Sequence, residues 1–481
     1  MTDHPTPSTS PAPPLRLYRF DRIVVIVMVV LLGAIALTIA LGDRVGVQIR
    51  RTLPEGIASS TSGIAIQFSE AMNWDSVIER VQVEPLLEGA YTWGGTTLRF
   101  RPTEALEPGA TYQVTLASGA ESANGRKVLA DTVYSFRVRT PRVAYLFPAN
   151  ATPQNVWIAD PAEPGNGEQI TFSPSGVLNF DISPDGTKLA FAERSTSTGT
   201  SDIKLLDLET GALTQLTNCP DSDCNSPVWR PDGNMLAYHR VDLNSELSDL
   251  GVSPTRVWLV DMSTTPPTNR PLFADSQLLG YSPQWSADGS RISVYDNNSV
   301  GILVYDFSDG SLLVVPTRNG GSDVALSPDG RRIIFPFLII DQSGGGARNT
   351  LRIADLESEE ITDLTSPADP IDDATTAWHP DGRYVALARR YTDERYTRTR
   401  QLYLLDTESS EVQPLIEEER YYNGFFSWDP QGEQLVVQRF PELTETGEMN
   451  STGTPEIWTY DMETEQLTQV VENGYLPRWV P

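Results

Sequence analysis

Two short acidic runs have the residue types that could bind a metal ion. Asp221 lies two residues before Asp223, and Asp369 is followed by Asp372 and Asp373. Carboxylate oxygens in loops are the ligands that Ca²⁺ prefers, but neither run has the spacing of an EF-hand loop. Acidic loop residues are more commonly solvated surface charges. We therefore expect no metal-binding residue in this chain.

The sequence has two cysteines, Cys219 and Cys224, in the run CPDSDC. Their closeness suits a small loop-closing disulfide if the domain lies outside the cytoplasm. Two free thiols in a surface loop are the alternative, because spacing does not fix the geometry. A zinc site would need further ligands, and the three histidines are His4, His239 and His379.

Residues 389–400, RRYTDERYTRTR, form a basic and aromatic run within an acidic protein. This composition makes the run our predicted contact for a partner, and a solvated hairpin is the alternative. The predicted contact residues are Arg389, Arg390, Tyr391, Arg395, Tyr396, Arg398 and Arg400.

No familiar catalytic motif occurs. The sequence has no Gly-x-Ser-x-Gly, no HExxH, no phosphate-binding loop and no dinucleotide-binding glycine pattern. Beyond His4, a Ser-His-Asp triad has two histidines from which to take its base. We predict no catalytic or cofactor-binding residue and no cofactor. A carboxylate pair could still do glycosidase chemistry, but the sequence does not show which repeats meet in space.

Composition limits the class of protein. The chain has 481 residues, too many for one ordinary domain, and its 36 prolines and 35 glycines suit an all-β protein with many turns. The formal net charge of -28 excludes nucleic acid as an expected partner, because phosphates would be repelled.

The N-terminus predicts a membrane anchor. Residues 1–21 are rich in Pro, Ser and Thr and predict a disordered cytoplasmic tail. Residues 22–42 predict a transmembrane signal anchor, since an uncharged helix from Ile23 to Leu41 would span roughly 30 Å. A cleaved signal peptide is the alternative, although its apolar region is usually shorter, at about 7–15 residues. Long domains translocate largely regardless of charge, which favours a cytoplasmic N-terminus.

Residues 45–140 contain short alternating strands separated by turns, which predicts a β-sandwich. FSEAMNWDSV (68–77), LRFRPTEALEPGATYQVTL and a closing YSFRV together resemble the bacterial Ig-like domain of the surface-layer type. That resemblance implies a spacer or attachment module of an exported protein. Leu106 and Tyr112 flank a Pro-Gly turn and resemble the tyrosine corner of such sandwiches.

A second pattern repeats over the rest of the chain. WRPDGNMLAY (229–238) has five counterparts, and the distances between successive turn glycines are 47, 56, 41, 52 and 50 residues. Proline and aspartate suit the central positions of a type I turn, and glycine takes the following position with positive φ. We therefore interpret these residues as turn formers and not as catalysts. They are Asp185, Gly186, Asp232, Gly233, Asp288, Gly289, Asp329, Gly330, Asp381, Gly382 and Gly432.

Each repeat continues with an apolar strand that ends in aspartate, from VWIAD (156–160) to IWTYD (457–461). A period of 40–50 residues with four short strands indicates propeller blades. VAYLF (143–147) and LPRWV (476–480) supply the missing strands of a last blade, so we predict seven blades, with six as the alternative. Eight of the ten tryptophans fall at repeat positions, which predicts core residues.

These repeats, over residues 142–481, resemble the PD40 or TolB-like propeller family, also found as the propeller of prolyl oligopeptidase-type peptidases. The resemblance implies the fold but little about function, because the matching residues are structural. The α/β domain of TolB does not precede the repeats and no hydrolase domain follows them, so we expect neither a Tol–Pal role nor peptidase activity.

The combined expectation is an all-β, single-pass membrane protein of a bacterial cell envelope, with its C-terminal domains outside the cytoplasm. It is expected to be a binding or scaffold protein whose propeller recognises a protein or an envelope glycan. A propeller enzyme acting on glycan or peptide and an envelope sensor are the alternatives. Long connections should carry the contacts, at 240–255, 338–349, 389–400 and 439–455.

Overall fold

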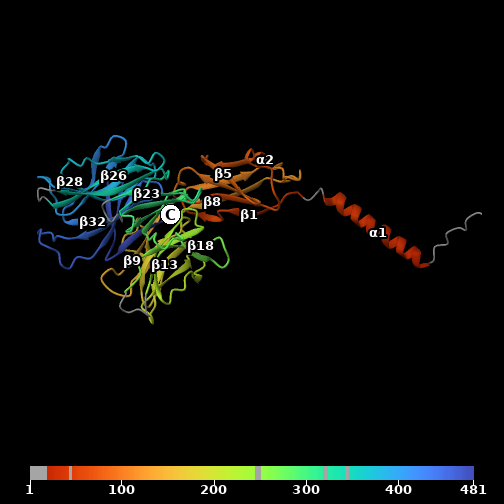
Figure 1. Ribbon diagram of the computed structural model, residues 1–481. Coiled ribbons are helices and arrows are strands. Elements are labelled where there is room, and N and C mark those ends of the chain that lie inside the picture. Colours follow the sequence, from red (N-terminus) through yellow and green to blue (C-terminus); the bar gives the residue numbers. More distant parts are fainter. Residues whose placement is uncertain (1–18, 43–45, 244–250, 318–322, 342–345) are drawn as a thin grey trace, which may run out of the picture. The chain divides into compact units, whose positions relative to one another are not determined.

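The computed structural model describes residues 19–42, 46–243, 251–317, 323–341 and 346–481 (Figure 1). Almost all of the predicted N-terminal tail therefore lies outside the described residues. Helix α1, Arg19–Gly42, includes an 18-residue stretch, Phe20–Leu37, with a mean hydropathy of 2.5. This helix is long and apolar enough to cross a membrane, and a signal sequence near an N-terminus has the same properties.

The described chain divides into two compact units, and the Ig-like strands contribute to both. These strands form two four-stranded sheets, with the orders β1-β3-β6-β5 and β2-β8-β7-β4. Tyr112 Oη accepts a hydrogen bond from Glu107 N at 3.2 Å, as expected for a tyrosine corner. The elements are β1 (Ile49–Leu53), β2 (Gly56–Ala58), β3 (Ile64–Phe68), α2 (Trp74–Ile78), β4 (Val81–Glu84), β5 (Gly89–Gly94), β6 (Thr97–Pro102), β7 (Thr111–Leu116) and β8 (Thr132–Val138).

Strands β9 to β36 form antiparallel sheets of four strands each, two of which are joined into one sheet of eight. The join is a single parallel pair, Ser201 with Asp223. Divided at this pair, the described strands make seven groups of four. The strands up to β23 are β9 (Arg142–Phe147), β10 (Asn155–Ala159), β11 (Gly167–Gln169), β12 (Val177–Ile182), β13 (Lys188–Arg194), β14 (Ser201–Asp207), β15 (Leu213–Gln215), β16 (Ser222–Trp229), β17 (Met235–Asp242), β18 (Arg256–Asp261), β19 (Thr268–Pro271), β20 (Tyr281–Trp285), β21 (Arg291–Asp296), β22 (Gly301–Asp306) and β23 (Leu312–Pro316).

In each group one edge strand, called here its first strand, contacts the first strand of the next group, and these contacts close a ring. In the group that contains β9, this first strand is β36. The order around the ring is β12, β16, β20, β24, β28, β32, β36 and back to β12. The remaining strands are β24 (Ala325–Leu326), β25 (Arg332–Asp341), β26 (Gly346–Asp355), β27 (Ile361–Asp363), β28 (Ile371–Trp378), β29 (Tyr384–Tyr391), β30 (Gln401–Asp406), β31 (Val412–Ile416), β32 (Tyr421–Trp428), β33 (Gln434–Pro441), β34 (Glu456–Asp461), β35 (Leu467–Glu472) and β36 (Tyr475–Val480).

The last strand, β36, pairs antiparallel with β9, the first strand of the ring region, with Trp479 opposite Val143. One sheet thus has the order β11-β10-β9-β36, three strands from the start of the ring region and one from the end of the chain. This closure was predicted and is confirmed. Four-stranded sheets arranged in a ring that the chain ends close are the architecture of a β-propeller.

The turn aspartates hold their own turns. Asp185 Oδ1 accepts hydrogen bonds from Ser183 Oγ at 2.6 Å and from Thr187 N at 3.0 Å. Burial opposes ionisation of Asp185, but these hydrogen bonds lower its pKa overall. The turn glycines have φ between 62° and 78°, a conformation that favours glycine. Asp185 and the turn glycines thus lie in the turns, and Asp185 bonds within its own turn.

The tryptophans at the repeat positions are buried in whole or in part: Trp229, Trp428 and Trp479 are buried, and the other five are partly buried. None of the eight is among the exposed large hydrophobic side chains of the described chain. The middle strands carry the most buried positions, and all six residues of β30 are buried. Outer strands are exposed, and β15 has no buried residue.

Because neighbouring strands of each group are antiparallel, the connections alternate between two ends of the propeller. We call the end with the first-to-second and third-to-fourth connections the turn end, since it carries the Pro-Asp-Gly turns. The opposite end, with the second-to-third connections and the passages to the next group, is the loop end. Residues 389–400 and the disulfide between Cys219 and Cys224 both lie at the loop end.

Candidate functional site

The basic run at 389–400 begins inside the protein. Arg389, on β29, is 6% exposed and lies opposite Asp373 of β28 in the strand register. Its Nε and Nη2 donate to the two carboxylate oxygens of Asp373 at 2.7 and 3.0 Å. This fork geometry satisfies both buried charges. Arg389 therefore belongs to the core and not to a contact surface, which corrects the prediction for this residue.

Asp372 pairs with two further arginines of the predicted contact. Its Oδ2 accepts hydrogen bonds from Arg390 Nη2 and Arg400 Nη2, each at 2.7 Å. Its Oδ1 accepts from Asn349 N at 3.0 Å. Asp372 and Asp373 of the acidic run are thus paired with arginine. Among the described residues, no group of three His, Cys, Asp or Glu side chains could hold a metal ion.

The tip of the same connection lies at the surface. Tyr396 is exposed, and the guanidinium of Arg395 lies 3.8 Å from the ring centroid of Tyr391. Arg395 Nη2 also pairs with Asp393 at 2.6 Å, and Arg398 Nε lies 3.7 Å from Glu442. Of the predicted contact residues, Arg395, Tyr396 and Arg398 therefore form the accessible part.

The next sheet holds a second buried arginine, Arg439 of β33, which the sequence placed only at the start of the expected connection 439–455. Arg439 lies opposite Asn423, the register position that Asp373 holds for Arg389. Its Nε donates to Asn423 Oδ1 at 3.2 Å and its Nη2 to Glu418 Oε2 at 2.7 Å. Its side chain is fully buried, and Nη1 has no partner among the described residues. An arginine in the strand QLVVQRFP, whose other polar residues are two uncharged glutamines, was the available signal.

The loop end also carries exposed apolar side chains from several sheets. In contrast, the described turns between first and second and between third and fourth strands carry no exposed large hydrophobic residue. The nearest are Leu213 and Leu312, which begin outer strands. The exposed apolar residues in or beside the loop-end connections are Phe172, Val252, Val300, Ile340, Tyr396, Tyr422 and Met449.

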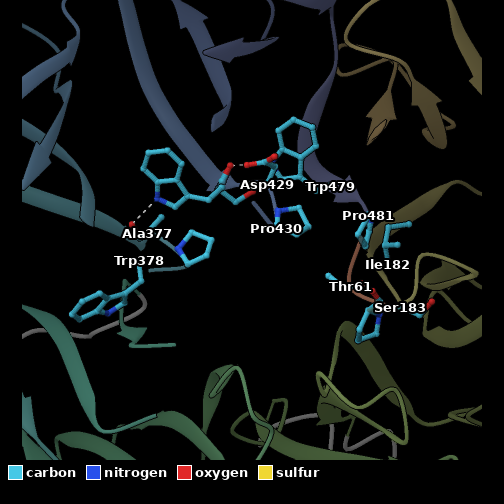
Figure 2. A pocket seen from close by; sticks show the side chains of 13 residues that line it. Thr61, Ile182, Ser183, Ala377, Trp378, Asp429, Pro430, Trp479 and Pro481 are labelled. Atoms are coloured by element: carbon cyan, nitrogen blue, oxygen red, sulfur yellow. Dashed lines mark hydrogen bonds between the residues drawn. The ribbon is translucent and has the colours of Figure 1, made fainter. Parts of the chain in front are cut away.

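A cavity of about 440 Å³ opens at the turn end, lined largely by the ends of first strands. Figure 2 shows Trp378, Asp429 and Trp479 around one side of it and Ile182 and Ser183 on the other. Asp429 is the one Asp or Glu side chain among the described lining residues, and burial raises its pKa to about 6. The cavity wall therefore lacks the second carboxylate that a glycosidase mechanism needs.

His239, a possible catalytic base, is buried and has a structural hydrogen bond. Burial lowers the pKa of His239 to about 4. Its Nε2 accepts a hydrogen bond from Ser282 N at 2.9 Å, and so it is occupied by a backbone donor. This geometry leaves His239 unsuited to activate a hydroxyl nucleophile.

Two family models match parts of the chain. Residues 43–138 match the bacterial Ig-like domain, and residues 150–310 match the N-terminal β-propeller domain of prolyl oligopeptidase. No curated protein matches the sequence. The predicted resemblance to an Ig-like domain and to a propeller family is confirmed.

Solved propeller structures resemble the chain at low identity. The β-propeller domain of the trilobed protease from Pyrococcus furiosus is 16% identical, with a TM-score of 0.44, over 76% of this chain and 94% of that one. Oligogalacturonate lyase from Vibrio parahaemolyticus is 14% identical, with a TM-score of 0.46, over 69% and 85%. TolB from Acinetobacter baumannii is 19% identical, with a TM-score of 0.37, over 69% and 82%. These likenesses concern the fold alone. The chain is thus similar to bacterial Ig-like domains over residues 43–138 and to the prolyl oligopeptidase propeller over residues 150–310.

Proposed function

We propose that this protein is a non-catalytic binding module of a bacterial cell envelope and that the loop end of its propeller binds a protein or an envelope glycan. The observation that carries the proposal is the contrast between the two ends. Exposed apolar side chains occur in or beside loop-end connections of several sheets, and the described turns of the other end have none. Contiguous apolar patches mark interaction surfaces, so the proposal requires that these side chains contribute to a shared contact surface.

The composition of the loop end supports the same role. Tyr396, Tyr422 and Met449 lie there together with Arg395 and Arg398. Tyrosine, methionine and arginine are enriched in the cores of protein interfaces.

Placement at the membrane rests on two features. Helix α1 is long and apolar enough to act as the anchor, and the Ig-like domain that follows would be the spacer. The disulfide between Cys219 and Cys224 fits an oxidising compartment outside the cytoplasm. In the proposed topology the N-terminus is cytoplasmic and the propeller faces the envelope.

The test is retention of envelope material by the full chain in lipid nanodiscs. Solubilised envelope proteins and cell-wall fragments are passed over immobilised wild type, over a Tyr396→Ser/Met449→Ser variant, and over Leu213→Ser as the control. Leu213 and Tyr396 are both 57% exposed, so the control removes a comparably exposed apolar group away from the loop-end connections.

The proposal expects one saturable component that wild type and Leu213→Ser retain and that Tyr396→Ser/Met449→Ser loses. Equal retention by all three proteins would refute the loop end as the binding surface. Chemically altered glycan or peptide in the flow-through, with no component retained, would favour the enzyme alternative.

A further inference from the structure

Two buried arginines in neighbouring sheets occupy the same position but have different partners. Arg389 faces Asp373, and its Nε and Nη2 both donate to that carboxylate. Arg439 faces Asn423, whose amide carries no charge. Burying a guanidinium away from water is costly unless a carboxylate neutralises its charge. The sheet β32–β35 therefore lacks an internal carboxylate that its neighbour has.

The charge of Arg439 is instead met by a carboxylate from a loop. Glu418 lies in the connection between β31 and β32, and its side chain is 41% exposed. Its Oε2 accepts from Arg439 Nη2 at 2.7 Å, while its backbone N donates to Gln401 Oε1 at 2.6 Å. The backbone at Glu418 is thus fixed, and its partly exposed carboxylate reaches a fully buried guanidinium from the solvent side.

The guanidinium of Arg439 is held in place by two aromatic rings and by Asn423. It lies over Tyr421 at 3.9 Å and Trp458 at 5.1 Å from the ring centroids. Asn423 fixes its Nε, and Asn423 Nδ2 in turn donates to Arg400 O at 3.4 Å. Stacking and a fixed Nε leave the two Nη groups as a preorganised fork, which matches the geometry of a carboxylate.

Two arginines that contact the partners of Arg439 also have unused donors: Arg400, whose O accepts from Asn423, and Arg420, which lies beside Glu418. Within the described residues, Arg439 Nη1, Arg400 Nε and Arg420 Nε have no hydrogen-bond partner. Arg420 Nε also lies 3.6 Å from Glu418 Oε1, so Glu418 stands between two guanidinium groups. Buried donors without partners are uncommon in native proteins, and each calls for an acceptor, which is an ordered water or a ligand.

We propose that Arg439 is the centre of a binding site for a carboxylate group at the loop end, and that Glu418 occupies the place of the ligand's carboxylate in the free protein. This inference rests on the proposed binding role of the loop end and names the chemistry of its ligand. A peptide carboxylate and the carboxylate of an acidic sugar are the two sources of such a group.

The experiment measures binding to the full chain in nanodiscs by isothermal titration calorimetry. The probes are N-acetylglycine and D-glucuronate, with N-acetylglycinamide and D-glucose as their uncharged counterparts. The variants are Glu418→Gln, which removes the internal competitor, and Asn423→Asp, which supplies the carboxylate that Arg389 already has. Glu419→Gln is the matched control, since it makes the same charge change one residue away on an exposed side chain.

The inference expects a carboxylate probe to bind Glu418→Gln about tenfold more tightly than wild type or Glu419→Gln, because no internal carboxylate competes. The uncharged probes should not bind. Asn423→Asp should lose binding while its melting temperature is equal to or above that of wild type. The tighter of the two carboxylate probes identifies the source.

Equal affinity of Glu418→Gln and Glu419→Gln, or no carboxylate binding to either, would overturn the inference. Unchanged binding by a folded Asn423→Asp would overturn it as well. If Asn423→Asp does not fold, the comparison of the two glutamate variants decides alone. If no carboxylate probe binds but envelope material is retained normally, the proposed function stands and the carboxylate site does not. If a carboxylate probe binds but no envelope material is retained, the carboxylate site stands and the proposed function does not.

Discussion

The indole Nε1 of Trp479, on the last strand, donates a hydrogen bond to the backbone oxygen of Ser427 at 3.1 Å. The same bond recurs between other neighbouring sheets, from Trp428 to Ala377 O at 3.1 Å and from Trp378 to Ala325 O at 3.0 Å. The repeated tryptophans thus join successive first strands, and Trp479 extends this link to the strand that closes the ring.

The closing bond predicts a difference between two tryptophan variants. Trp479→Phe should destabilise the propeller by about 1–3 kcal/mol beyond the loss of ring volume, because Ser427 O loses its donor. Trp229→Phe is the control, since Trp229 Nε1 has no partner among the described residues. Differential scanning calorimetry should show a lower melting temperature for Trp479→Phe than for Trp229→Phe. Equal melting temperatures would show that the closing bond contributes nothing measurable.

The buried pairing of Arg389 with Asp373 predicts a large effect on stability when the carboxylate is removed. Asp373→Ala should cost about 3–5 kcal/mol of unfolding free energy, because it leaves a buried guanidinium without a counter-charge. Asp393→Ala removes the surface partner of Arg395 and should not change stability measurably. Urea unfolding followed by circular dichroism compares the two. A small loss for Asp373→Ala would contradict the buried pair.

His239 predicts a pH dependence of stability. Its pKa in the fold, about 4, lies below the usual value near 6.5, so the unfolded chain binds the proton more tightly. The contribution of His239 to the free energy of unfolding should be fully present above pH 6.5. It should fall by about 3 kcal/mol as the pH decreases toward 4. His239→Gln should lack this decline.

Two buried carboxylates change stability with pH in the opposite direction to His239. The effect of His239 is therefore measured as the difference in unfolding free energy between wild type and His239→Gln. Burial raises the pKa of Asp181 and of Asp429 to about 6, so the folded chain keeps their protons between pH 6 and 4. Their contribution rises as the pH falls and cancels in the difference between wild type and variant. A pH-independent difference would show that His239 does not titrate as described.

The disulfide predicts a redox state that depends on compartment. Protein purified from its native membrane, denatured and treated with iodoacetamide, should show no alkylation of Cys219 or Cys224 by mass spectrometry. The same chain without residues 1–42, produced in a reducing cytoplasm, should be alkylated at both cysteines. Free thiols in the membrane-derived protein would contradict export of the propeller.

The repeated turns could be predicted from sequence because their chemistry is local. Asp185 bonds to Ser183 and Thr187, both within two residues, and Gly186 follows with φ of 62°. The closure by β36 was also accessible, because the incomplete motifs at 143–147 and 476–480 complement each other. Local turn chemistry and a fixed period together constrain the topology strongly.

The ionic pairs at the loop end could not be predicted, because they depend on the register between strands. Nothing in the run at 389–400 distinguishes Arg389, which meets Asp373 inside the sheet, from Arg398, which faces outward. Arg439 and Glu418 are separated by a hairpin strand, and their contact follows from the fold of the connection between β31 and β32. Side-chain partners across strands are a property of the assembled sheet.

Hydrogen–deuterium exchange of the full chain in nanodiscs, alone and with the retained envelope component, tests the binding surface most directly. The account predicts slower exchange on binding at the loop-end connections, among them 148–154, 389–400 and 442–455, and no change at the turns 183–187 and 230–234. Protection of the turns with unchanged loop-end connections would contradict the assignment of the loop end as the binding face.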